Sequence, residues 1–205
     1  MKSTIKFLLS ALLMMGINVA KAQDNSVAEA FTQSYYYEKV SNYTSAISSL
    51  KKVYSATSYE INLRLGWLTY NAGLYKESIS YYQVAINLMP LSIEARLGYV
   101  YPAAAFGNMN SVIEQYTKIL EIDPQNSTAN YRMGYIYYDK KDYPTAYKYF
   151  EKVVNLYPFG YDGLLMFAWT NFQLGKVREA QVLFNKVLLL SPGDKSATEG
   201  LSLIK

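Results

Sequence analysis

The same run of apolar residues returns four times along the chain, and each copy ends in a proline. The copies read YYQVAINLMP, YTKILEIDP, YFEKVVNLYP and LFNKVLLLSP, and their prolines lie 34 residues apart at Pro90, Pro124, Pro158 and Pro192. Proline cannot continue a helix and biases the residue before it towards extended backbone. Each run is therefore predicted to be a helix that ends close to its proline, within a unit that repeats every 34 residues.

A second pattern lies upstream of each run and places a small residue directly after a large apolar one. The pairs are Leu65-Gly66, Leu97-Gly98, Met133-Gly134 and Phe167-Ala168. Together the two patterns resemble the tetratricopeptide repeat (TPR) family, whose repeat is a pair of antiparallel helices with small residues where the helices cross. The resemblance implies an all-α fold, a right-handed α-solenoid of about five helix-turn-helix repeats with a C-terminal capping helix.

The resemblance covers nearly all of the chain after the first residues. The expected repeats cover residues 27–60, 59–92, 91–126, 127–160 and 161–194, and a capping helix covers about 195–205, so that one TPR domain spans 23–205. In the family, position 8 of the repeat is small and position 24 is large and apolar. Position 8 is assigned to Ser34, Gly66, Gly98, Gly134 and Ala168. Position 24 is assigned to Leu50, Tyr82, Tyr116, Phe150 and Phe184.

The third repeat departs from this pattern. In the second repeat, the position-8 glycine and the turn glycine are Gly66 and Gly73. In the third repeat the corresponding glycines are Gly98 and Gly107, which are two residues further apart and have Pro102 between them. An interior proline removes a backbone donor and costs a helix about 3 kcal/mol. We therefore expect a two-residue insertion here, with a kink, a bulge or an early end of the helix, and we interpret it as a tolerated insertion in preference to a functional hinge.

Aromatic residues mark one face of the first helix in each repeat. In the fourth repeat, Tyr131, Tyr135 and Tyr138 follow one another at i, i+4 and i+7, which places them on one side of a helix. Position 9 is aromatic in every copy, as Tyr35, Trp67, Tyr99, Tyr135 and Trp169. In the resembling family this face lines a concave groove that binds extended peptides. The candidate groove residues are Phe31, Tyr35, Trp67, Tyr70, Tyr99, Tyr131, Tyr135, Tyr138, Trp169 and Phe172. The alternative is that these rings pack between neighbouring repeats as core.

The pattern favours a non-enzymatic envelope scaffold or adaptor that binds a protein or peptide partner in this aromatic groove. A glycan-binding module is an alternative, because rings also stack on sugars, with Asn71, Asp139, Asp162 and Gln173 as polar neighbours. An accessory subunit of a larger envelope complex is another. Some family members grip a C-terminal carboxylate with Lys, Arg and Asn along the groove. That set is absent here, because position 13 reads Lys39, Asn71, Ala103, Asp139 and Gln173.

Composition excludes several kinds of chemistry. The chain has no Cys and no His, which removes thiol nucleophiles, disulfides, imidazole bases and the usual zinc ligands. No Gly-rich phosphate loop and no nucleophile with a plausible base appear. We therefore expect no enzymatic activity, no cofactor and no metal site.

The first 22 residues are typical of a secretory signal peptide. Lys2 and Lys6 precede the apolar run Phe7–Ile17, and Ala20-Lys21-Ala22 provides small residues before a cleavage site at Gln23. The apolar run is short for a membrane span, so stable membrane insertion after cleavage is not expected, although an uncleaved anchor is the alternative.

Loss of this segment would also change the charge. The 20 basic residues of the chain would fall to 17 against 16 acidic ones, so that the net charge would drop from +4 to +1. A net charge this close to zero does not indicate the basic surface that nucleic-acid binding requires. A secreted chain without disulfides fits the periplasm or surroundings of a bacterium, most readily a Gram-negative one.

Overall fold

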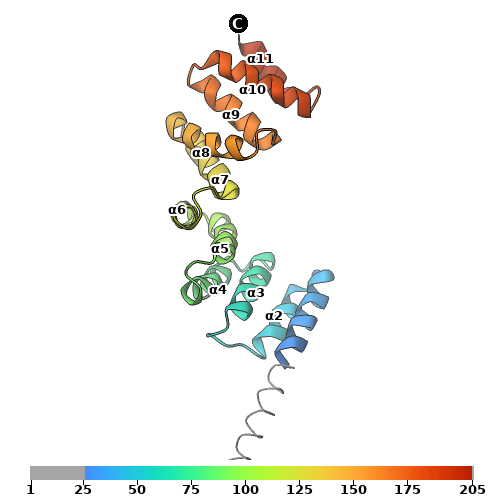
Figure 1. Cartoon of the computed structure of the whole chain (residues 1–205). Helices are drawn as coiled ribbons and strands as arrows, with labels where there is room; N and C mark the ends of the chain where they lie inside the picture. The colour runs from blue at the N-terminus through green and yellow to red at the C-terminus, as the bar shows by residue number, and fades with distance from the viewer. Residues whose placement is uncertain (1–25, 205) are drawn as a thin grey trace, which may run out of the picture. The chain divides into compact units, whose positions relative to one another are not determined.

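The computed structural model describes residues 26–204, which contain helices and no strand (Figure 1). The expected signal peptide lies outside the described residues. The first described helix covers residues 26–39. The helices that follow are α2 (Tyr43–Lys51), α3 (Tyr59–Asn71), α4 (Tyr75–Leu88), α5 (Ile93–Ala105), α6 (Met109–Ile122), α7 (Ser127–Asp139), α8 (Tyr143–Leu156), α9 (Tyr161–Gln173), α10 (Val177–Leu190) and α11 (Lys195–Leu203).

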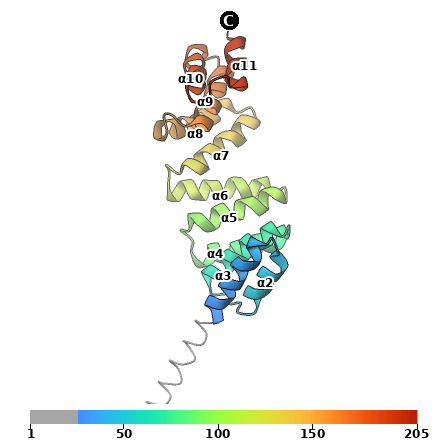
Figure 2. The ribbon, with the colours of Figure 1, turned by 90° about the vertical axis from the view of Figure 1, so that its right-hand side faces the viewer.

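Within each unit, consecutive helices pack against one another as antiparallel neighbours (Figures 1 and 2). The most extensive contacts join α3 to α4, α7 to α8 and α9 to α10, and each second helix also packs on the first helix of the next pair, as α4 does on α5. The helix α11 packs on α10 and closes the C-terminal end. The predicted fold class, an all-helical solenoid of TPR-like pairs with a capping helix, is confirmed.

The chain divides into two compact units, one ending at Asn108 and the other beginning at Met109. The first unit holds the helices from residue 26 to α5, and the second holds α6 to α11. Within residues 26–204, no helix is both long and apolar enough to cross a membrane.

The turn inside each helix pair fixes the register of the repeats. Its key residue has a positive φ, between 56° and 82°, and is Ser41, Gly73, Gly107, Lys141 or Gly175. The helices α3, α5, α7 and α9 each begin 14 residues before that turn residue, at Tyr59, Ile93, Ser127 and Tyr161. We number repeat positions from these helix starts. Since the left-handed backbone is costly for residues with a Cβ, glycine is the favoured residue at such a turn.

The predicted insertion in the third repeat is wrong. Helix α5 has 13 residues, as α3, α7 and α9 do, and it runs through Pro102 to Ala105. The early end predicted at Pro102 therefore does not occur. Counted from the helix start, Val100 takes position 8 and Gly98 takes position 6.

Gly98 is small for a different reason than the one predicted. The buried ring of Tyr82 lies between Gly66 and Gly98, and a Cβ at Gly66 would meet ring atoms at 2.9 Å, while a Cβ at Gly98 would overlap the ring more severely. Burial raises the pKa of Tyr82. The position-24 ring thus packs on position 8 of its own repeat and on position 6 of the next one.

The second unit uses the same contact. Phe150 lies against Gly134 at position 8, and Phe184 lies against Gly200 at position 6 of α11. Both rings are fully buried. These contacts let neighbouring helices approach closely and bury the largest side chains of the core.

Replacing Gly98 by Ala is expected to lower the free energy of unfolding by about 1–2 kcal/mol, because overpacking outweighs the ~1 kcal/mol that alanine gains over glycine in a helix. Chemical denaturation measures the effect. Tyr82→Leu provides the matched background, since Leu50 holds the equivalent position in the first repeat. There, Gly98→Ala should be neutral or stabilising. Equal destabilisation in both backgrounds would show that Tyr82 is not the reason for the glycine.

Candidate binding groove

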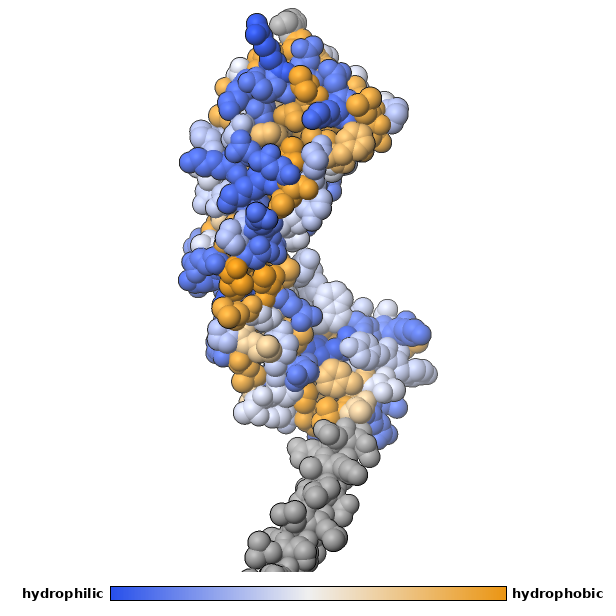
Figure 3. Space-filling view, in the orientation of Figure 1, coloured by the Kyte–Doolittle hydropathy of each residue, from blue (hydrophilic) through white to orange (hydrophobic). Residues whose placement is uncertain are grey.

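An open groove lies on the first helices of the first unit. It encloses about 970 Å³ and is lined by residues of helix 26–39, α3 and α5, together with Tyr82 in the middle of α4 and Met89 at its C-cap. We call it the first-unit groove. Its aromatic lining residues on the first helices are Tyr35, Tyr59, Trp67 and Tyr101. Apolar residues reach the surface in both units, mixed with polar ones (Figure 3), so exposed apolar area alone does not single out a site, whereas this cavity does.

The aromatic row at position 9 is exposed in four of the five repeats. Tyr35 is 55% exposed, Trp67 40%, Tyr101 49% and Tyr135 50%. Tyr101, and not Tyr99, occupies position 9 of the third repeat because α5 begins at Ile93. The placement of Tyr99 in the groove was wrong, since that side chain is only 8% exposed. Sequence reasoning missed Tyr101 because Gly98 was taken as position 8, although the spacing from Gly107 would have located it.

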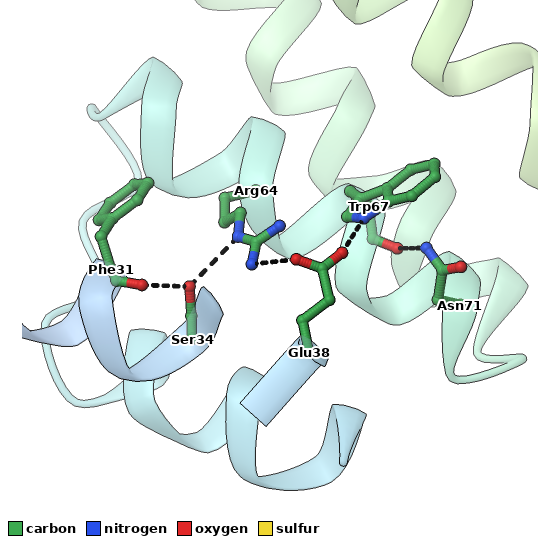
Figure 4. A network of polar contacts seen from close by, with 6 residues as sticks. All are labelled: Phe31, Ser34, Glu38, Arg64, Trp67 and Asn71. Atoms are coloured by element: carbon green, nitrogen blue, oxygen red, sulfur yellow. Dashed lines mark hydrogen bonds and ion pairs between the residues drawn. The ribbon is translucent and has the colours of Figure 1, made fainter. Parts of the chain in front are cut away.

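A polar network contacts two aromatic side chains of the first-unit groove, Trp67 and Tyr35, and Figure 4 shows its hydrogen bonds to Trp67. The Arg64 guanidinium donates from Nη2 to Oε2 of Glu38 at 2.6 Å and from Nε to Oγ of Ser34 at 3.2 Å. The Trp67 indole donates from Nε1 to Oε1 of the same Glu38 at 2.5 Å. The Arg64 guanidinium also lies over the Tyr35 ring, 3.9 Å from its centroid. Both position-9 rings, Tyr35 and Trp67, are therefore oriented by one ion pair.

Glu38 is charged in this network. Partial burial favours its protonated form, but the hydrogen bonds from Arg64 and Trp67 and the charge of Arg64 outweigh that effect, so the pKa of Glu38 lies below its usual value. Arg64 is buried, with 9% of its side chain exposed. A buried guanidinium without a partner would be costly, so the ion pair ties helix 26–39 to α3 as well as positioning the rings.

Tyr70 and Phe31 complete the predicted residues of the first unit, and neither lines the first-unit groove. Tyr70 is half-buried, with its ring centroid 6.2 Å from that of Trp67 and 5.9 Å from that of Tyr101. Phe31 is half-buried against the core of helices 26–39, α2 and α3. Tyr70 thus lies beside the exposed rings of Trp67 and Tyr101, and Phe31 lies beside that of Tyr35.

The predicted residues of the second unit are more mixed. Tyr135 is exposed, whereas Tyr131 and Tyr138 are half-buried. Tyr131 packs edge-on against the core ring of Phe150, with centroids 5.8 Å apart, and Tyr138 packs in the same manner against Tyr143 at 5.3 Å. These three tyrosines share one helix but differ in how much of each ring remains available to a partner.

Trp169 is built into the core of the second unit more firmly than Trp67 is into the first. Its ring centroid lies 5.0 Å from that of Phe184 and 5.7 Å from that of Phe172, and its Nε1 donates to Oγ of Ser196 in α11 at 2.9 Å. Trp169 and Phe172 are both half-buried against the core cluster of α9 and α10. The ring of Trp169 thus packs within its own repeat, on Phe172 and Phe184, and only its hydrogen bond to Ser196 reaches the capping helix.

Sequence and structure comparisons identify the fold. Residues 127–159 match the family model of the tetratricopeptide repeat. A solved structure of a tetratricopeptide repeat protein from Parabacteroides merdae superposes with a TM-score of 0.75 at 21% identity, covering 88% of this chain and 72% of that one. The fold is that of a TPR protein.

Further solved structures lead to the same fold. The MamA protein superposes with a TM-score of 0.69 at 19% identity, covering 80% of this chain and 91% of that one. MamA from residue 41 to its end, from Desulfovibrio magneticus, gives 0.69 at 16% identity, with 83% and 97% covered. No curated protein matches the sequence. At these identities the similarity concerns the fold alone.

Several residues of the first-unit groove were not predicted from the sequence. Tyr59, Glu60, Arg64 and Glu94 line it, and Glu38 holds two of its side chains. The charged residues among them, Glu38, Glu60, Arg64 and Glu94, belong to no motif that would have marked them in the sequence. Among the described residues, no group of three or more acidic, His or Cys side chains is placed to hold a metal ion.

The two tryptophans are expected to respond differently to truncation. Trp169→Ala should lower the free energy of unfolding by about 2–3 kcal/mol, somewhat less than a fully buried tryptophan, because it removes the contact with Phe184. Trp67→Ala should cost about 1 kcal/mol, chiefly through the lost hydrogen bond to Glu38. Urea denaturation followed by circular dichroism measures both. A larger loss for Trp67 than for Trp169 would contradict the assignment of Trp67 to an open surface.

Proposed function

We propose that the protein is a non-enzymatic scaffold that binds an extended segment of a protein partner in the first-unit groove. The observation that carries this proposal is the set of exposed rings of Tyr35, Trp67 and Tyr101 along one cavity of about 970 Å³. A cavity of this size matches the upper range of small-ligand sites, about 300–1,000 Å³. Because the groove is open and runs along three helices, an extended segment can place several side chains in it.

The chemistry of the lining supports peptide binding. Tyrosine and tryptophan supply large contact areas with few rotatable bonds, and they dominate binding hot spots at about 2 kcal/mol or more each. The rings of Tyr35 and Trp67 are already oriented by Arg64 and Glu38. Side chains that are held before binding lose less entropy when a partner arrives.

Capture of a C-terminal carboxylate is not favoured in this groove. Arg64 is the one basic residue among the described lining side chains, and its guanidinium is bound to Glu38 and Ser34. Glycan binding has less support as well. Of the polar side chains considered for it, Asn71 uses its amide to donate to the carbonyl of Trp67 at 2.8 Å.

We further propose that the protein is exported to the periplasm or the surrounding medium of a bacterium. The support is the charged start, the short apolar run and Ala20-Lys21-Ala22. Mass spectrometry of the exported protein should find an amino terminus at Gln23. A membrane-bound species that retains Met1 would contradict export in this form.

Selection from a library of random decapeptides tests the proposed binding. Trp67→Ala and Tyr101→Ala should each weaken the selected peptides by about thirtyfold, the equivalent of a 2 kcal/mol hot spot. Tyr135→Ala is the matched control, because it removes an equally exposed position-9 ring from the other unit. Affinities follow from fluorescence anisotropy, and circular dichroism verifies that each variant is folded.

Two outcomes would contradict the proposal. One is unchanged affinity of folded Trp67→Ala and Tyr101→Ala for every selected peptide. The other is the absence of any selected peptide, together with binding of the same protein to a glycan array, which would favour the glycan alternative.

A further inference from the structure

The first-unit groove carries uncompensated negative charge. Glu60 and Glu94 both line it, and both are exposed. Arg64 is the single cation among the described lining residues, and its charge is taken up by Glu38. The lining therefore presents two carboxylates to a ligand without a matching positive group of its own.

The two carboxylates occupy equivalent places. Each is the second residue of its helix, Glu60 in α3 and Glu94 in α5. Oε2 of Glu60 accepts from Oγ of Ser58 at 3.0 Å, and Oε2 of Glu94 accepts from the Tyr59 hydroxyl at 3.3 Å. One carboxylate oxygen of each residue accepts a hydrogen bond from the protein, and these hydrogen bonds orient the two carboxylate groups.

The aromatic surface beside these carboxylates also favours a cation. The faces of Trp, Tyr and Phe attract Lys and Arg side chains, with a strength of about 0.5–1 kcal/mol at exposed sites. The protein itself shows the arrangement, because the Arg64 guanidinium lies on the Tyr35 ring while bonded to the Glu38 carboxylate. Tyr59 lines the same groove and its hydroxyl donates to Oε2 of Glu94, so a guanidinium or ammonium from a ligand would meet an aromatic ring and a carboxylate together there.

We infer that the first-unit groove selects peptide segments in which Lys or Arg stands among apolar residues. The cationic side chain is bound by Glu60 and Glu94 and by the neighbouring rings. Apolar side chains of the segment lie on Leu63, Ile93 and Leu97, which line the same cavity. This inference rests on the proposed function and adds the chemistry of the partner to it.

If the two carboxylates had a purely structural role, their neutralisation would affect peptide binding differently. Acidic residues in the first turn of a helix stabilise it through the helix dipole, and both residues stand there. In that role their neutralisation would alter stability slightly and would change the affinity for charged and uncharged peptides by the same factor. Selectivity between two peptides therefore separates binding from a structural contribution.

The experiment uses fluorescence of Trp67. Trp169→Phe leaves Trp67 as the single tryptophan of the chain, so its emission reports occupancy of the groove. The probes are a library-selected decapeptide with a central Lys and its analogues with Gln and Glu at that place. The Lys peptide should bind about fivefold more tightly than the Gln peptide at low salt, and more tightly still than the Glu peptide, with the preference shrinking as salt screens the charges.

Neutralising the two carboxylates should reduce this preference. In Glu60→Gln/Glu94→Gln, the Lys and Gln peptides should bind within about twofold of each other, because only the rings then favour the cation, while the amide side chains keep the local hydrogen bonds. Glu114→Gln/Glu151→Gln is the matched control, since it removes two exposed carboxylates from second helices of the other unit. It should retain the full preference.

The contradicting outcomes separate selectivity from binding itself. Equal binding of the Lys and Gln peptides to the unaltered groove would overturn the inferred selectivity and leave peptide binding in place. The inferred selectivity is likewise overturned if the double variant weakens both peptides by the same factor. If no peptide changes the emission of Trp67, both the inference and the proposed function fail.

Discussion

The buried ring of Tyr82 lies so close to Gly66 and Gly98 that neither position has room for a Cβ. One ring thereby fixes the distance between three helices: α4, which carries it, the α3 of the same repeat and the α5 of the next. Phe150 and Phe184 make the corresponding contacts with Gly134 and Gly200 in the second unit. Close packing of this kind has few alternatives, because shifting a helix by one residue would drive a side chain into the ring.

The exposed aromatic row depends on this contact. In the first unit, Gly66 at position 8 and Gly98 at position 6 face the Tyr82 ring, and position 9 of α3 and of α5 is turned towards solvent. Tyr35, Trp67 and Tyr101 then project into one open groove. The ion pair of Arg64 with Glu38 adds the finer orientation, since it holds the Trp67 indole and the Tyr35 ring through the same two charged groups. Core packing thus positions the site, and a single polar network shapes it.

The sequence allowed the fold to be predicted because proline spacing and small residues report directly on helix ends and helix crossings. The prediction failed at Gly98, which was assigned to position 8 of the third repeat but occupies position 6. Both positions face a ring at position 24, so a glycine allows close packing at either one. Gly107 is the firmer marker of register, because its positive φ is required by the turn itself. The charged part of the groove was not predictable in this way. Glu38 and Arg64 are 26 residues apart and meet only when two repeats stack, and Trp169 looked equivalent to Trp67 although Phe184 and Ser196 hold it in place.

The central claim is that the ring contact at Gly98 turns Tyr101 outward and Tyr99 inward. Hydroxyl-radical footprinting of the folded protein, read out residue by residue by mass spectrometry, tests it most directly, because two tyrosines on the same helix and two residues apart have opposite expected exposure. The account predicts that Tyr101, at 49% exposure, is oxidised several times faster than Tyr99, at 8%. Faster oxidation of Tyr99, or equal rates in a folded sample, would contradict it.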